Sequence, residues 1–226
     1  MSKTVTSSAE ITAEAYDRAP SAFSRPIPLR IFSFSAAKYG FDRLFAVMVL
    51  PTLGVVALAL LCLNPILNPG PLFYVQIRMG KHRKPFRMYK FRSMTTAPVA
   101  SRGHDEGLEL ARITTLGRFI RKHRIDELPN IINVLKGEMS VIGPRPDAWS
   151  HARHYCRTVP GYARRFGVRP GITGLAQVEA GYAEGHDATA RKAALDARYI
   201  RAYGFRQEAR IVVKTVGVVL TGDGAQ

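Results

Sequence analysis

The chain has 226 residues and a formal net charge of +16 at pH 7, from 33 lysines and arginines against 17 aspartates and glutamates. Hydrophobic residues make up 46% of the chain, which excludes wholesale disorder, and the two cysteines exclude both a scaffold stapled by several disulfides and a zinc site of four cysteines. The excess of basic residues indicates a polyanionic partner, such as nucleic acid, an anionic membrane surface or a phosphorylated small molecule.

Residues 1–36 are predicted to form a polar, flexible arm. The segment is rich in serine, threonine and alanine and carries prolines at positions 20, 26 and 28, so we expect at most a short helix near residues 9–19. The chain does not begin with a basic segment followed by an apolar one, so we expect no cleaved signal peptide.

Residues 44–63 form the most apolar part of the chain, a run of twenty residues without a charge. As a helix this run would be roughly 30 Å long, which is enough to cross a bilayer. A buried core helix of a soluble protein is disfavoured, because the run has no polar face. The pattern therefore predicts a membrane helix within residues 37–70.

Pro51 lies inside this run and predicts a break, because proline removes one helical hydrogen bond and clashes with the carbonyl one turn earlier. Both flanks of the run are basic, so neither is marked as the cytoplasmic side. These flanking residues are Arg25, Arg30, Lys38, Arg43, Arg78, Lys81, Arg83 and Lys84. On the residues alone, two arrangements fit equally: a single membrane span, and a re-entrant hairpin that bends at Pro51 and returns to the same face.

Residues 71–222 are predicted to form one globular domain of the α+β class, mostly helical. A short β-hairpin is expected over residues 72–78 and 85–92, and an amphipathic helix from residue 128 to Gly137. Further helices are expected over residues 112–124, 148–158, 188–203 and 208–220, with a loop-rich stretch at 161–185. The last helix carries an apolar stripe that either packs against the core or lies in a membrane interface.

Two adjacent carboxylates, Asp126 and Glu127, stand in a basic neighbourhood just ahead of the amphipathic helix. Pro129 is favoured in a first helical turn, which would place both carboxylates at the positive end of that helix. Simple helix capping by Asp126 is the plain alternative.

Basic and glycine-rich segments near these carboxylates suit phosphate binding. The predicted hairpin ends at Lys90 and Arg92, and Arg145 stands between two prolines that hold its backbone stiff for bidentate phosphate contact. A glycine-rich turn over residues 170–177, which ends at Gln177, either brings backbone N–H groups close to an anion or is an ordinary tight turn.

In these motifs the chain resembles the bacterial sugar transferase family, small membrane phosphoglycosyltransferases that start glycan assembly on polyprenyl phosphate. The resemblance covers residues 38–220, nearly the whole chain except the arm. The motifs that carry it are Phe41-Asp42-Arg43, Gln76-x-Arg78-x-Gly80, Lys90-Phe91-Arg92-Ser93-Met94, Arg112-Ile113-Thr114, Asp126-Glu127-Leu128-Pro129, Met139-Ser140, Gly143-Pro144-Arg145-Pro146 and Arg169-Pro170-Gly171-x-Thr173-Gly174.

The resemblance implies that Asp126 attacks the β-phosphorus of a UDP-sugar, releases UMP and keeps a phosphosugar that polyprenyl (undecaprenyl) phosphate then removes. Glu127 is implied to deprotonate the lipid phosphate or to help hold a metal. Mg²⁺ is the expected cofactor, bound through Asp126 and Glu127. The residues implied to bind substrate or its phosphates are Lys90, Arg92, Arg145 and Gln177.

The resemblance also favours the re-entrant arrangement of residues 37–70, broken at Pro51, over a single span. It implies a monotopic enzyme on the cytoplasmic face of a bacterial inner membrane, with residues 71–222 as the catalytic domain and interfacial amphipathic helices. Its expected partners are a UDP-sugar, polyprenyl phosphate and anionic lipids, not nucleic acid, and a homo-oligomer is left open. The competing interpretation is a membrane-tethered basic protein that binds anionic lipid or nucleic acid without catalysis.

Overall fold

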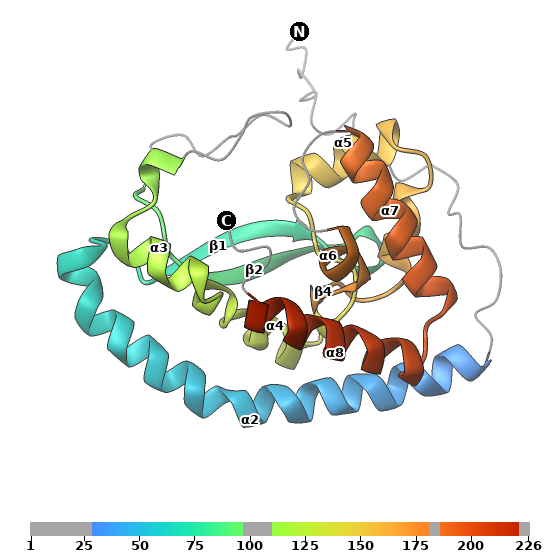
Figure 1. Ribbon diagram of the computed structural model, residues 1–226, viewed down its shortest axis with the longest axis horizontal. Helices are drawn as coiled ribbons and strands as arrows, with labels where there is room; N and C mark the ends of the chain where they lie inside the picture. Colours follow the sequence, from blue (N-terminus) through green and yellow to red (C-terminus); the bar gives the residue numbers. More distant parts are fainter. Residues whose placement is uncertain (1–28, 97–109, 181–185, 222–226) are drawn as a thin grey trace, which may run out of the picture.

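A computed structural model describes residues 29–96, 110–180 and 186–221. The arm and its expected short helix near residues 9–19 lie outside these ranges. In the described part the chain is mostly helical, with a small β-hairpin and one long apolar helix near its N-terminal end, which confirms the predicted fold class at this level. Figure 1 shows the long helix lying beneath a compact body of strands and shorter helices.

The long helix, α2, covers Leu29–Leu67 and begins ahead of the boundary predicted at residue 37. It stays helical through both Pro51 and Pro65, so the helical backbone is not interrupted at Pro51, and a bend there is carried by one continuous helix. Figure 1 shows one bowed helix rather than two joined by a turn. A proline removes a single hydrogen bond, and the rest of the ladder on either side keeps an apolar segment helical.

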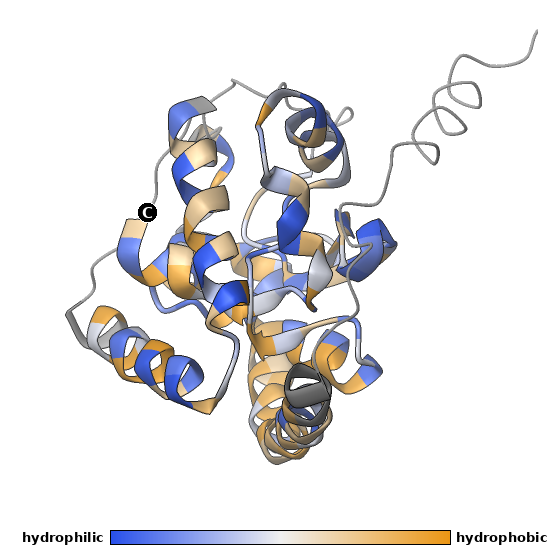
Figure 2. Ribbon diagram, turned by 90° about the vertical axis from the view of Figure 1, so that its right-hand side faces the viewer, coloured by the Kyte–Doolittle hydropathy of each residue, from blue (hydrophilic) through white to orange (hydrophobic). Residues whose placement is uncertain are grey.

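A narrow seam of α2 faces the body of the protein. Ala46, Leu53 and Leu60 are buried at seven-residue intervals, whereas most of the other large apolar side chains of the helix are exposed. Those exposed side chains are Phe41, Leu44, Val47, Met48, Leu50, Val55, Leu58, Leu61, Leu63, Ile66 and Leu67. By length and composition Phe34–Leu67 is able to cross a membrane, and only 17% of its most apolar window is buried. Figure 2 shows mostly hydrophobic colouring along this helix, at the bottom of the view.

The predicted β-hairpin is confirmed. Strand β1 (Phe73–Met79) pairs antiparallel with β2 (Pro85–Phe91), and a short 3₁₀ turn, η1 (Lys81–Arg83), joins them. The register places Tyr74 opposite Lys90. Because side chains alternate between the two faces of a strand, the buried Phe91 points into the core and Lys90 points to the opposite face.

The central part of the chain follows the predicted order, with shorter elements. After η2 (Leu110–Arg112) come helix α3 (Thr115–Lys122), the 3₁₀ turn η3 (Ile125–Glu127) and helix α4 (Asn130–Lys136). Gly137 ends α4 with a φ of 76°, a conformation that glycine adopts without strain. Helix α5 (Trp149–Thr158) is close to its predicted position.

The stretch predicted as loops contains regular structure. It holds η4 (Tyr162–Gly167), strand β4 (Gly171–Thr173) and helix α6 (Leu175–Ala180), and β4 pairs in parallel with β3 (Ser140–Ile142). Helices α7 (His186–Arg201) and α8 (Phe205–Thr221) close the described chain, as predicted. Figure 1 shows α8 running beside the N-terminal half of α2.

A buried polar cluster ties α2 to this body. Lys38 Nζ donates to Glu208 Oε2 on α8 at 2.8 Å and lies 3.5 Å from Asp42 Oδ2. Ser140 Oγ of β3 donates to the same Asp42 oxygen at 2.6 Å, and the Tyr199 hydroxyl donates to Glu208. The cluster fixes α2 against β3, the strand that leads into the loop carrying Arg145.

Candidate active site

The 3₁₀ turn η3 places two neighbouring carboxylates in one site. Arg124 begins the turn in a left-handed conformation (φ 55°), which reverses the chain after α3. Ile125 and Leu128 pack into the apolar cluster around Phe91. Because these flanking side chains turn inward, the carboxylates of Asp126 and Glu127 between them reach the face of β2 that carries Lys90.

Two cations hold the Glu127 carboxylate. Lys90 Nζ donates to Glu127 Oε1 at 2.6 Å, and Arg145 donates to both carboxylate oxygens, through Nη1 to Oε2 at 3.1 Å and through Nη2 to Oε1. This bidentate pairing is the strongest geometry available to arginine and a carboxylate. Lys90 and Arg145 hold the pKa of Glu127 well below its usual range, against the opposing effect of burial.

Asp126 is in a different environment from its neighbour. Its nearest cation among the described residues is Lys90, with Nζ 4.0 Å from Oδ2, and no described residue donates a hydrogen bond to its carboxylate. The side chain is 14% exposed, so substrate can still reach it. Burial and the adjacent Glu127 raise the pKa of Asp126, although Lys90 partly offsets them. Asp126 is therefore a largely buried carboxylate whose oxygens accept no hydrogen bond from the described residues and can bind a substrate or an ion.

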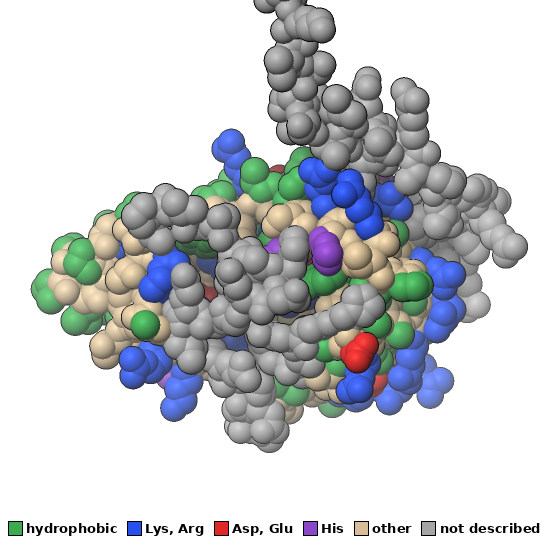
Figure 3. Space-filling model, turned by 90° about the horizontal axis from the view of Figure 1, so that it is seen from above, with side chains coloured by type: hydrophobic (Ala, Val, Ile, Leu, Met, Phe, Trp, Pro, Cys, Tyr) green, Lys and Arg blue, Asp and Glu red, His purple; other side chains and the backbone are tan. Residues whose placement is uncertain are grey.

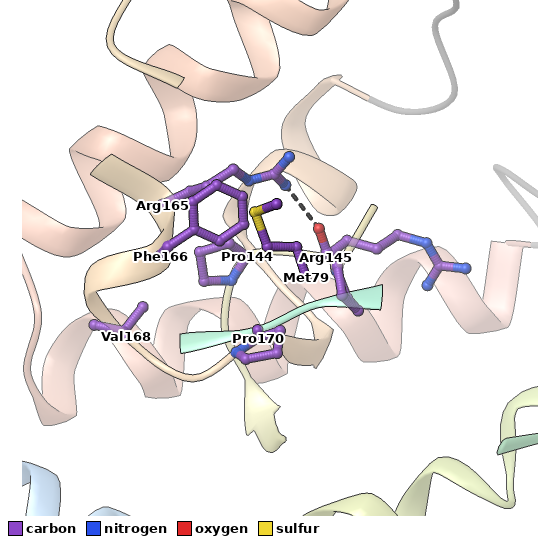
Figure 4. A pocket seen from close by; sticks show the side chains of 9 residues that line it. Met79, Pro144, Arg145, Arg165, Phe166, Val168 and Pro170 are labelled. Carbon is purple, nitrogen blue, oxygen red and sulfur yellow. Dashed lines mark hydrogen bonds between the residues drawn. The ribbon is translucent and has the colours of Figure 1, made fainter. Parts of the chain in front are cut away.

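The loop that carries Arg145 is fixed from behind by a buried arginine that the sequence reading did not single out. Arg165 Nη2 donates to the Arg145 carbonyl oxygen at 2.7 Å, and Arg165 Nη1 pairs with Asp147. Figure 4 shows this bond beside a cavity of about 10 Å³, while the Arg145 guanidinium extends away from the cavity. Arg78 Nη1 donates to the Pro146 carbonyl at 2.8 Å on the same loop. The predicted stiffness of this loop comes from these bonds as well as from its prolines.

Arg92, predicted to bind phosphate, lies elsewhere. It is 6% exposed, and its guanidinium donates to the Asn68 carbonyl just after α2, while Asn68 Nδ2 donates back to the Arg92 carbonyl at 2.8 Å. A side chain on Gly70 would overlap the guanidinium, with an added Cβ only 2.0 Å from Nη1. Arg92 therefore ties the end of α2 to β2 and makes no contact with the Glu127 group.

The glycine-rich turn also has a structural role in this state. An added Cβ on Gly171 would lie 2.1 Å from Gly143 N, and one on Gly174 would lie 2.1 Å from Gly143 O. The Gly143 and Gly171 amides already donate, to the Thr173 and Pro144 carbonyls. These glycines let two backbones touch rather than cradle an anion.

Gln177, predicted to bind substrate, follows this turn on α6. Its Nε2 donates to the Ile172 carbonyl at 3.0 Å, and its buried Oε1 has no partner among the described residues. The structure thus brings together four of the predicted site residues and leaves Arg92 and Gln177 outside that group. The four are Asp126, Glu127, Lys90 and Arg145.

The two predicted metal ligands, Asp126 and Glu127, differ in whether their carboxylate oxygens are available to a metal ion. Within the described ranges no group of three or more histidine, cysteine, aspartate or glutamate side chains is placed to hold a metal ion. Both oxygens of Glu127 already accept from cations, so Asp126 alone has oxygen atoms available. Mg²⁺ in proteins is commonly held by one or two carboxylates together with substrate phosphates and water. The donor set fits a magnesium ion that arrives with a phosphorylated substrate.

The whole site lies within the part of the chain that one family model matches. The model of the family described as bacterial sugar transferase matches residues 33–222. The chain is 42% identical over 205 residues (88% of this chain, 47% of the relative) to the UDP-N-acetylgalactosamine-undecaprenyl-phosphate N-acetylgalactosaminephosphotransferase of Aeromonas hydrophila. It is 39% identical over 166 residues (70% and 60%) to the UDP-glucose:undecaprenyl-phosphate glucose-1-phosphate transferase of Caulobacter vibrioides.

A third relative is nearer to this chain in length. The uncharacterised sugar transferase EpsL of Bacillus subtilis is 38% identical over 189 residues, which are 82% of this chain and 88% of the relative. The chain spans about half the length of the first two relatives it matches.

Proposed function

Because the chain belongs to the bacterial sugar transferase family, we propose that it transfers a sugar-1-phosphate from a UDP-sugar to a polyprenyl phosphate such as undecaprenyl phosphate, releasing UMP. The observation that carries the proposal is the pairing of a desolvated carboxylate, Asp126, with a carboxylate neutralised by Lys90 and Arg145. Such a reaction is the first membrane step in making an exopolysaccharide, O-antigen or other glycoconjugate.

Asp126 acts as the nucleophile in this proposal. Its carboxylate oxygen attacks the β-phosphorus of the UDP-sugar, the bond from that phosphorus to the bridging oxygen breaks, and UMP leaves with that oxygen. The sugar phosphate stays on Asp126 as an acyl phosphate until an oxygen of polyprenyl phosphate attacks the same phosphorus and releases the carboxylate. The product is a polyprenyl diphosphate sugar.

The surrounding cations answer the main obstacle, which is the attack of one anion on another. Lys90 Nζ lies 2.6 Å from Glu127 and 4.0 Å from Asp126, so its charge is close to any phosphate that Asp126 attacks. A carboxylate with so low a pKa is a weak base, so Glu127 is better suited to orient Lys90 and Arg145 than to deprotonate the lipid phosphate. When bound, Mg²⁺ would neutralise phosphate charge, with Asp126 as its protein ligand.

The membrane arrangement of α2 is part of the same proposal. Both ends of the helix are tied to one body: Lys38 bonds to Glu208 near the first end, and Asn68 bonds to Arg92 just past the second. A helix held this way cannot carry its ends to opposite sides of a bilayer. A bowed, re-entrant α2 on the cytoplasmic face of the inner membrane accommodates both ties and its exposed apolar side chains.

Helix α8 supports an interfacial position for the body as well. Phe205, Val213 and Val216 are exposed to 79%, 72% and 52%, on a helix that also carries Arg206 and Arg210. Exposed apolar side chains beside basic ones are typical of helices that lie at a membrane surface. This position would let a lipid-borne phosphate and a soluble nucleotide sugar reach Asp126 together.

The test is Asp126→Asn in the full chain with a panel of UDP-sugars and undecaprenyl phosphate. We expect UMP release to fall by about 10³-fold or more, because the amide is a poor nucleophile, with an unchanged thermal unfolding midpoint. Mass spectrometry should detect a sugar-phosphate adduct on Asp126 in the native protein when the lipid acceptor is omitted. Asp187→Asn, at an exposed position on α7, serves as the matched control.

Normal turnover by Asp126→Asn would overturn the mechanism. The competing function, a membrane-tethered basic protein without catalysis, gives a different result: its binding of anionic lipid or nucleic acid would survive this substitution and fall steeply with salt, and no UMP would appear from the native protein.

A further inference from the structure

Two arginines from distant parts of the chain converge beside the end of α4. An added Cβ on Gly137 would lie 3.1 Å from Arg43 Nη2 and 3.4 Å from Arg169 Nη2. The Nη2 atoms of the two arginines are therefore separated by no more than the sum of these two distances. Arg43 comes from α2 and Arg169 from the segment just before β4, so the fold rather than the local sequence brings them together.

Tyr39 on α2 orients the Arg169 guanidinium, and a third cation lies near the same ring. The Arg169 guanidinium carbon lies 3.7 Å from the centre of the Tyr39 ring, and Lys81 Nζ from the tip of the β-hairpin lies 5.8 Å from it. Stacking on an aromatic ring fixes the plane of a guanidinium while its N–H groups stay available. Arg169 and Lys81 thus both lie by the Tyr39 ring, and Arg43 follows four residues later on the same helix.

These cations have no acidic partner within the described residues. No ion pair or hydrogen bond joins a described carboxylate to Arg43, Arg169 or Lys81, whereas Lys38 one turn earlier on α2 is paired with both Asp42 and Glu208. Three like charges repel one another unless an anion lies among them. The cluster is therefore complementary to an anion that the chain itself does not supply.

The position of the cluster on α2 indicates where that anion comes from. Arg43 is the last charged residue before the apolar run, and Val47 and Leu50 follow it on the same side of the helix, at i+4 and i+7. Val47 is 53% exposed and Leu50 is 37% exposed. An amphiphile with an anionic head at Arg43 would lay its hydrocarbon along these side chains.

We propose that Arg43, Arg169 and Lys81 form a binding site for the phosphate headgroup of an anionic membrane phospholipid. The proposal rests on the membrane position of α2 given under the proposed function, and it does not involve the Asp126 site. Three of the chain's basic residues would then serve one defined lipid site, rather than only adding to the general attraction between the basic protein and an anionic membrane.

The test measures retained lipid by native mass spectrometry of the full chain, released from micelles that contain phosphatidylglycerol and phosphatidylcholine. The native protein should keep one phosphatidylglycerol in preference to phosphatidylcholine. Arg43→Gln, at an exposed position that no described residue pairs with, should weaken this binding about fivefold, and Arg43→Gln with Arg169→Gln about thirtyfold, at roughly 1 kcal/mol for each charge near the surface. The matched control, Arg157→Gln with Arg191→Gln, removes two exposed charges from α5 and α7 and should change it less than about twofold.

Three results would overturn the inference: unchanged phosphatidylglycerol binding by the double variant, an equal loss in the control, or displacement by inorganic phosphate as readily as by lipid. Preferential retention of undecaprenyl phosphate over phosphatidylglycerol would assign the cluster to the acceptor substrate and would also contradict it. A native protein that does not associate with membranes would instead contradict the membrane position of α2. UMP release, and its dependence on Asp126, is measured separately and tests the catalytic proposal alone.

Discussion

At the scale of single residues, Asp126 and Glu127 show how one turn of chain gives two carboxylates different chemistry. Burial and its charged neighbour raise the pKa of Asp126, while Lys90 and Arg145 hold the pKa of Glu127 well below its usual range. Adjacent titratable groups whose pKa values are pushed apart are a common basis for dividing catalytic roles. Here the division favours Asp126 as the attacking group and Glu127 as the anchor for the two cations.

The raised pKa of Asp126 gives a prediction for the pH dependence of the reaction. The attacking carboxylate must be ionised, so activity is present above the Asp126 pKa and is lost as the pH falls through it. We expect the acidic limb of UMP release to lie at a higher pH than an ordinary aspartate would give. Lys90→Met removes the largest influence that lowers this pKa, so it should move the limb to still higher pH.

Initial rates of UMP release across the acidic range, at UDP-sugar concentrations well below KM, measure both positions, because such rates report the pKa values of the free enzyme. The residual rate of Lys90→Met is expected to be low, because Lys90 is also proposed to neutralise the substrate phosphates, and only the position of the limb is compared. A limb that does not move in Lys90→Met, or that moves to lower pH, would show that Asp126 is not the group that titrates.

At the scale of elements, the polar cluster between α2 and the body predicts a large effect on stability. Lys38→Met would leave Asp42 and Glu208 buried without their cation. Removing one partner of a buried ion pair typically costs about 3 kcal/mol or more. We therefore expect Lys38→Met to lower the free energy of unfolding by about 3 kcal/mol in detergent, whereas Lys84→Met at the exposed hairpin tip should change it by less than about 0.5 kcal/mol. Equal unfolding curves for the two variants would contradict the role assigned to Lys38.

The helices and strands also show which elements local sequence patterns predict and which they miss. The hairpin, the amphipathic helix and its end at Gly137 follow from local periodicity and turn chemistry, and the sequence analysis predicted all three. The parallel pair β3–β4 was missed because each strand has three residues and the pairing depends on Gly143 meeting Gly171 across a connection that contains α5 and η4. The partners of Arg92 were missed for a similar reason, since nothing near it in sequence points to the end of α2.

The site itself was partly predictable. Asp126 and Glu127 were predicted as a pair from adjacent residues, and Lys90 and Arg145, chosen from separate motifs, lie against them in the fold. Arg165 was not, because a buried arginine looks in sequence like any other basic residue of a basic chain. Only the fold shows that its guanidinium holds the backbone of Arg145.

At the scale of the whole molecule, α2 is longer than a simple span requires. Its 39 residues would extend about 58 Å if straight, against about 30 Å for the hydrocarbon core of a bilayer. The helix is bowed instead, and the body contacts it near both ends. In Figure 3, hydrophobic side chains gather at the left edge of the molecule, on the side where Figure 1 shows the C-terminal end of α2, and basic side chains lie at the right edge and at separate places along the upper and lower edges. This distribution is suited to a protein whose apolar helix enters one leaflet while its basic rim stays at the surface.

The arrangement predicts that both flanks of α2 face the same side of the membrane. Single cysteines at the exposed positions Ala36 and Lys84, in a chain with Cys62→Ser and Cys156→Ser, test this with a membrane-impermeant maleimide. Both should react in inside-out vesicles and neither in intact spheroplasts.

A chain that keeps only Cys62 is the matched control. The Cys62 side chain is exposed on α2, so protection in vesicles and reaction in detergent would show that a bilayer covers it. Labelling of positions 36 and 84 from opposite sides would instead establish a full span. The ties of α2 to the body at Glu208 and at Arg92 could then not both exist in the membrane, because they hold the two ends of the helix to one side.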